Sequence, residues 1–202
     1  MTEEDLYQTI LEPAEGEIFK DKNSKFIGFA FPVDNEDQIK QHLEDVKKTH
    51  YSARHWCYAY QIGAESKQYR ANDDGEPSNS AGMPIYGQIQ SFEVTNILII
   101  VVRYYGGVKL GVGGLINAYR TGAQLALEAS KIVERTINKE FQLIFEYKNM
   151  SKVMRLIKEN EVEIKKQTLE LNCMLEISVR KSNGSKVFEL FDQFYGIEIK
   201  EL

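Results

Sequence analysis

The sequence predicts an α+β protein of two domains, residues 1–135 and residues 136–202. The first indication is a change in amino-acid composition after Glu134, because the rest of the chain contains no proline and only two of the 14 glycines. The second is charge, since the whole acidic excess lies before residue 136 and the remainder is neutral. With 43% hydrophobic and 27% charged residues, the composition is that of a globular protein able to bury a core.

The elements of the first domain follow from local patterns. Residues 17–19 and 26–31 predict two strands around a polar turn. A helix is expected after the N-cap pair Asp34-Asn35, because apolar residues then recur one helical turn apart. The remaining expected elements are a strand at 54–62, its hairpin partner at 67–71, a polar loop at 72–82, a weakly periodic helix at 83–92, a strand at 95–105 and a helix at 115–130. The strand at 95–105 is expected to be central, because its continuous Ile/Leu/Val run implies burial on both faces.

The second domain is expected to alternate strands and helices in the order βαββαβ. The segments that carry this pattern are 137–147, 151–159, 162–166, 168–179, 185–194 and 196–200. This order within about 65 residues is the ferredoxin-like plan.

Charge and cysteine content limit the function classes. Thirty acidic residues against 25 basic ones give a net charge of −5, which lacks the broad basic excess of an electrostatic nucleic-acid binder but allows a local basic patch. Cys57 and Cys173 lie too far apart for a disulfide framework or a four-ligand zinc site, which indicates a reducing compartment. The acidic start has no signal core, and the longest apolar run, 97–102, is too short to span a bilayer. We therefore expect a cytoplasmic protein with no metal and no cofactor.

A glycine-rich loop at 106–114 follows the expected central strand. It is not a P-loop, because Val112 and Gly113 stand where Lys and Ser/Thr are required, and it lacks the third glycine of a dinucleotide fingerprint. Backbone N–H groups at a helix N-terminus, together with nearby cations, favour the binding of an anion, most simply a phosphate. The alternative interpretation is that the glycines only allow a sharp turn and close packing. The expected anion- or nucleic-acid-binding residues are Arg103, Lys109, Gly111, Gly113, Gly114 and Arg120, and a Val at position 113 is expected to harm both folding and binding.

Two further groups of residues are candidates for recognition or for shaping the site. Asp73, Asp74 and Glu76 could hold a divalent cation or act as acid and base, but Gly75 and Pro77 favour a solvated turn. His55 and Cys57 share one face of a strand and could form a nucleophile–base pair or half a metal site. A core or supporting role is the interpretation we favour for them. Asn117 completes this second group of candidates.

Four blocks of sequence resemble the IMPACT/YigZ family over about 120 residues, in the right order. They are 55–60 (HWCYAY), 73–77 (DDGEP), 81–85 (AGMPI) and 102–119 (VRYYGGVKLGVGGLINAY). Asn79-Ser80 replaces a usual Gly-Thr, and Tyr105 replaces a usual Phe. Since Asn tolerates left-handed backbone geometry, the loop shape is expected to survive.

The resemblance implies a fold and leaves the function open. It implies an N-terminal βαβ domain of the type shared by a small-subunit ribosomal protein, elongation factor G domain IV and GHMP kinases, followed by a ferredoxin-like domain similar to elongation factor G domain V. Eukaryotic members modulate translation by binding a large ribosome-associated activator of a stress kinase, whereas catalytic residues are not established for bacterial members.

Three functions are consistent with these features. We favour a non-catalytic protein that associates with RNA or the ribosome, or with a protein partner of the translation machinery, and that modulates translation without touching a membrane. The first alternative is an enzyme of hydrolase or phosphotransfer type on a phosphorylated or peptide substrate, and the second is a protein-interaction adaptor.

Overall fold

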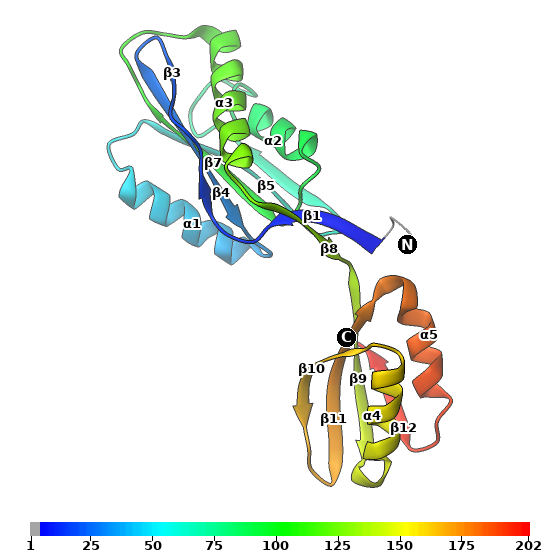
Figure 1. Cartoon of the computed structure of the whole chain (residues 1–202). Helices are drawn as coiled ribbons and strands as arrows, with labels where there is room; N and C mark the ends of the chain where they lie inside the picture. Colours follow the sequence, from blue (N-terminus) through cyan, green and yellow to red (C-terminus); the bar gives the residue numbers. More distant parts are fainter. Residues whose placement is uncertain (1–4) are drawn as a thin grey trace. The chain divides into compact units, whose positions relative to one another are not determined.

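The computed structural model describes residues 5–202, which form two compact units (Figure 1). One unit contains residues 7–135, and the other contains residues 136–202 together with Asp5 and Leu6. Each unit has its own hydrophobic core. Within residues 5–202, no helix is both long and apolar enough to cross a membrane.

The first unit is built on a six-stranded sheet with β7 (Ile97–Tyr104) in its interior. The other strands are β2 (Ala14–Glu15), β3 (Phe19–Asp21), β4 (Ser24–Pro32), β5 (His55–Ile62) and β6 (Gln68–Asn72). The order is β2-β4-β7-β5-β6, with β3 also paired to β4. Residues 97–103 are all buried, so the prediction of a central strand is confirmed.

Helices cover both faces of this sheet (Figure 1). α1 (Glu36–Thr49) packs on one face, and α2 (Gly82–Ser91) and α3 (Gly111–Glu128) pack on the other. Asn35 caps α1 as expected, because its side-chain oxygen accepts hydrogen bonds from the backbone N–H groups of Asp37 and Gln38. α3 begins four residues earlier than the pattern predicts, since the glycines of residues 111–114 form its first turn.

A two-stranded ribbon of β1 (Leu6–Ile10) and β8 (Ile132–Thr136) was not expected from the sequence. Both strands are short, and each is stabilised by a partner more than 120 residues away in the chain. Local periodicity cannot detect such a pairing.

The second unit has the order βαββαβ that the sequence predicts. Its elements are β9 (Asn138–Glu146), α4 (Met150–Glu159), β10 (Glu163–Thr168), β11 (Asn172–Arg180), α5 (Lys181–Asp192) and β12 (Ile197–Glu201). The antiparallel sheet has the order β10-β11-β9-β12. α5 begins at Lys181, four residues before the expected start.

Candidate functional site

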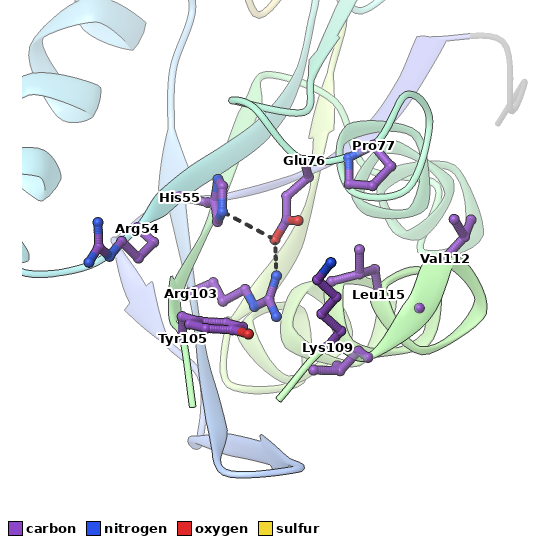
Figure 2. A pocket seen from close by; sticks show the side chains of 11 residues that line it. Arg54, His55, Glu76, Pro77, Arg103, Tyr105, Lys109, Val112 and Leu115 are labelled. Atoms are coloured by element: carbon purple, nitrogen blue, oxygen red, sulfur yellow. Dashed lines mark hydrogen bonds and ion pairs between the residues drawn. The ribbon is translucent and has the colours of Figure 1, made fainter. Parts of the chain in front are cut away.

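A pocket of about 780 Å³ lies in the first unit, where β7 ends and α3 begins (Figure 2). Its lining residues come from the start of β5 and the residue before it, the loop after β6, the end of β7, the glycine-rich loop and the first turns of α3. They are Arg54, His55, Glu76, Pro77, Arg103, Tyr105, Lys109, Leu110, Gly111, Val112 and Leu115. The fold therefore brings five of the expected residues into one cavity: His55, Glu76, Arg103, Lys109 and Gly111.

An ion pair between Arg103 and Glu76 forms the floor of the pocket. Arg103 Nη1 lies 2.5 Å from Glu76 Oε1, and each side chain is only 5% exposed. Removing two charges from water is costly, so their mutual attraction and further hydrogen bonds must offset the loss. The Nε of Arg103 is buried and has no hydrogen-bond partner within the described chain.

A second side chain, Tyr119, holds the Glu76 carboxylate, and His55 lies nearby. The Tyr119 hydroxyl donates to Oε1 at 2.7 Å, and His55 Nε2 lies 3.8 Å from the same oxygen. His55 Nδ1 lies 2.9 Å from the backbone carbonyl of Asp74, which can only accept, so Nδ1 carries a proton. Nε2 is then the nitrogen that faces the carboxylate, as Figure 2 shows. Burial raises the pKa of Tyr119, which keeps its hydroxyl a donor.

The other two carboxylates of the acidic run hold the loop itself. Asp73 accepts hydrogen bonds from the backbone N–H groups of Asn79, Ala81 and Gly82, at the start of α2. Asp74 accepts from the N–H of Trp56 at 2.8 Å. The three carboxylates of the acidic run therefore bind three different sets of partners. Among residues 5–202, no group of three or more His, Cys, Asp or Glu side chains could hold a metal ion.

Cys57 lies beneath the pocket and not in it. Its side chain is buried, and the thiol donates to the backbone carbonyl of Asp73 at 3.0 Å. Burial raises the pKa of this thiol well above its usual range, so the thiolate needed for nucleophilic chemistry is absent near neutral pH. The interpretation of Cys57 as a core residue is consistent with this setting.

The glycine-rich loop supplies the rim of the pocket. Gly111 has a φ of +78°, a left-handed conformation that glycine adopts without strain, and it opens α3. Leu110 stands at the N-cap position, so within the described chain no side chain caps the N-terminal N–H groups of α3. Lys109 is exposed beside them. The pocket thus joins unpaired N–H groups to three cationic side chains, Arg54, Arg103 and Lys109.

Four further expected residues, Arg120, Asn117, Gly113 and Gly114, do not line the pocket. Arg120 and Asn117 are exposed on α3 but do not line the pocket, because they point roughly 140° and 200° around the helix from Leu115, which does. A Cβ at Gly113 would meet no described atom within 4 Å, and its φ is not positive, so the structure gives no reason for Gly113→Val to harm folding, whereas the expected harm to binding stays a prediction. Asn79 has a φ of +59°, the left-handed geometry expected there.

Several lining residues were not singled out from the sequence. Pro77, Tyr105, Leu110, Val112 and Leu115 flank the expected residues by one or two positions and provide the apolar walls. Their proximity in sequence is the one signal that could have identified them. Arg54 directly precedes the candidate residue His55 in the sequence. Tyr119 belongs to the fourth block that resembles the family, but the sequence did not predict it as a site residue.

Comparison with known proteins places the chain in a family. The family model described as the Impact N-terminal domain matches residues 22–127. The IMPACT family member YvyE of Bacillus subtilis (strain 168) is 33% identical over 183 residues, which cover 91% of this chain and 84% of that protein. The IMPACT family member YigZ of Escherichia coli (strain K12) is 34% identical over 160 residues, 78% of each chain. A crystal structure described as that of a hypothetical protein is 29% identical, with a TM-score of 0.75 and 98% of both chains covered. On these matches, the chain belongs to the IMPACT family.

Proposed function

We propose that this protein acts in translation, without catalysis, by binding the phosphate groups of RNA, free or in the ribosome, at the pocket between β7 and α3. One observation carries the proposal: Arg54, Arg103 and Lys109 line the same cavity as the first residues of α3, a helix N-terminus that has no capping side chain within the described chain. A single carboxylate, Glu76, lines the same cavity. Unpaired N–H groups, a helix dipole and excess positive charge all favour an anion.

The association with translation is inferred from the family. The resemblance implies that eukaryotic members modulate translation through a ribosome-associated partner. The structure adds the argument for phosphate, since a net acidic protein needs a local basic site to approach RNA. Such a site binds through charge and gives little base specificity.

Fluorescence anisotropy with a short labelled RNA at several salt concentrations tests this function. Replacing Lys109 by Ala is expected to weaken binding to all RNA sequences similarly and to lower the slope of log K against log salt by about one. Lys67→Ala is the matched control, because Lys67 is exposed in the turn at the far end of β5 from His55.

The double variant Arg103→Ala, Lys109→Ala extends the test, with circular dichroism to verify its fold. An affinity and a salt slope equal to those of the unmodified protein would exclude the pocket as the RNA site. Equal effects of Lys67→Ala and Lys109→Ala would show that binding follows overall charge only.

A second function is favoured by one feature of the pocket. His55 and Glu76 of the acidic loop face Arg103 in the same cavity, an arrangement that could serve an enzyme on a phosphorylated substrate. Phosphorus NMR of nucleoside phosphates incubated with the protein tests this, and turnover abolished by His55→Ala would replace the non-catalytic proposal.

A further inference from the structure

The pocket changes in character between its rim and its floor. At the rim, Lys109 and Arg54 are exposed, and the first residues of α3, Gly111 and Val112, line the same cavity. At the floor, Glu76 and Arg103 are almost completely buried and paired with each other. A ligand that fits both regions therefore needs a negative charge at one end and hydrogen-bonding groups at the other.

The floor offers both an acceptor and a donor to such a ligand. The three contacts that the described residues make with the Glu76 carboxylate all fall on Oε1, which leaves Oε2 as an acceptor. Arg103 uses Nη1 for Glu76, and the described chain supplies no hydrogen-bond acceptor for Nη2. A carboxylate oxygen beside a guanidinium nitrogen matches the alternating donors and acceptors along the edge of a nucleobase.

Apolar side chains line the space between the rim and the floor. Tyr105 and Val112 are 47% and 54% exposed, and both border the cavity with the buried Leu115. The guanidinium carbon of Arg103 lies over the Tyr105 ring, 5.3 Å from the ring centroid, and this cation–π contact holds the aromatic ring at the cavity. In Figure 2 the Arg103 side chain lies directly above Tyr105, and Lys109 is drawn next to the Arg103 guanidinium.

We propose that the pocket takes one unpaired nucleotide, with the phosphate at the rim, the base against Tyr105 and Val112, and the base edge at Glu76 and Arg103. This inference rests on the proposed function and makes it more specific, because contact with the backbone alone would not need the apolar walls or the carboxylate. A volume of about 780 Å³ is in the range of pockets that enclose small ligands. The nucleotide can be free or can belong to a single-stranded segment or end of RNA.

Isothermal titration calorimetry with adenosine, guanosine, cytidine and uridine monophosphates, against ribose 5-phosphate and inorganic phosphate, tests the inference. At least one nucleotide is expected to bind about tenfold more tightly than ribose 5-phosphate, because a stacked base adds affinity. Equal affinities for the nucleotides and the sugar phosphate would overturn the proposal.

Substitutions at the wall and at the floor separate the contributions. Tyr105→Ala is expected to weaken nucleotide binding about tenfold and to leave ribose 5-phosphate unchanged. Tyr195→Ala, at a fully exposed tyrosine of the second unit, is the matched control and should change neither. Glu76→Gln should alter the ranking of the four nucleotides, and Tyr119→Phe should preserve it, since the latter leaves the Glu76 carboxylate and Arg103 in place.

Competition by RNA distinguishes the two sources of the nucleotide. If a single-stranded oligonucleotide displaces the bound mononucleotide and a blunt duplex does not, the pocket binds unpaired RNA. If neither displaces the mononucleotide, the pocket binds a free nucleotide. If RNA binding depends on Lys109 but no nucleotide exceeds ribose 5-phosphate, this inference fails and the proposed function stands. If nucleotides bind the pocket but RNA binding is absent, the proposed function fails instead.

Discussion

Glu76 is the residue on which the site depends, because it links the acidic loop to the end of β7. Its carboxylate takes contacts from Arg103, Tyr119 and His55 at a single oxygen. The neighbouring Asp73 and Asp74 bind backbone N–H groups instead. Sequence spacing marks these three carboxylates as one cluster but cannot assign their tasks, since each side chain's direction is set by contacts with residues distant in the chain.

The reactivity of the cysteines is a prediction at this scale. Both Cys57 and Cys173 are buried, and burial raises the pKa of Cys57, so neither thiol is expected to react with a disulfide reagent at pH 8 in the folded protein. Both should react once urea unfolds the chain. Each thiol that reacts releases a coloured thiolate from the disulfide reagent, and the absorbance of this product measures the number of reacting thiols. Rapid labelling of Cys57 in the folded state, identified by its loss in Cys57→Ala, would restore the nucleophile hypothesis.

At the residue scale, the sequence predicted the polar members of the pocket better than its walls. Arg103, Lys109, Glu76 and His55 stand out because charged residues next to glycines or strand ends are rarely explained by packing alone. Val112 and Leu115 carry no such mark, since apolar residues at these positions are equally typical of a helix core.

At the scale of elements, the start of α2 depends on the loop that precedes it. Ala81, the N-cap residue, has no side-chain acceptor of its own, and Asp73 supplies the missing acceptor from eight residues earlier. This is a long-range cap that local capping patterns do not reveal.

Replacing Asp73 by Ala tests this cap. The change leaves three backbone N–H groups without their acceptor and is expected to lower the free energy of unfolding of the first unit by about 2–4 kcal/mol. Urea unfolding followed by fluorescence of Trp56, the single tryptophan, reports on this unit. Asp37→Ala on α1 is the control, since its exposed ion pair with Lys40 contributes far less. A similar decrease in the free energy of unfolding in Asp73→Ala and Asp37→Ala would contradict the capping role of Asp73.

Element prediction succeeded where the pattern is local and failed where it is not. β7 is identified by its unbroken apolar run, and α4 by its amphipathic spacing. β1 and β8 lack such a pattern because their order comes from pairing across the length of the chain. The early start of α3 follows from glycines that a propensity argument assigns to a loop.

At the scale of the whole molecule, the boundary between residues 135 and 136 stays our proposal for the two domains. Asp5 belongs with the second unit, because its carboxylate accepts from the N–H of Ser182 at 3.1 Å and lies 3.2 Å from Arg180 Nε. Its backbone carbonyl accepts from the N–H of Ile137. The second domain therefore requires a residue from the other end of the sequence, which composition and charge cannot indicate.

The role of Asp5 makes the stability of the second unit dependent on pH. Hydrogen bonds from Ser182, followed by Arg180, lower the pKa of Asp5 in the folded state. A lowered pKa stabilises the fold fully above the unfolded value of about 4, and this contribution is lost as the pH falls through the folded value. Asp5→Asn is therefore expected to reduce stability at pH 6 and to change it little at pH 2.

Amide NMR signals of residues 138–201 during urea unfolding, at both pH values, measure this effect. Asp192→Asn, at an exposed position of the same unit, is the control and should follow the unmodified protein. If Asp5→Asn lowered the free energy of unfolding equally at pH 6 and at pH 2, the charge of the Asp5 carboxylate would not be the source of the stabilisation.

The central claim is that the pocket between β7 and α3 binds phosphate. The most direct test is a titration of the full chain with a short single-stranded RNA, followed by nitrogen–proton correlation NMR. We expect the largest shifts on the backbone N–H groups of Gly111, Val112 and Gly113 and on the Arg103 guanidinium, and we expect these shifts to become smaller in Lys109→Ala. Shifts confined to the second unit, with the signals of the glycine-rich loop unmoved, would contradict this claim.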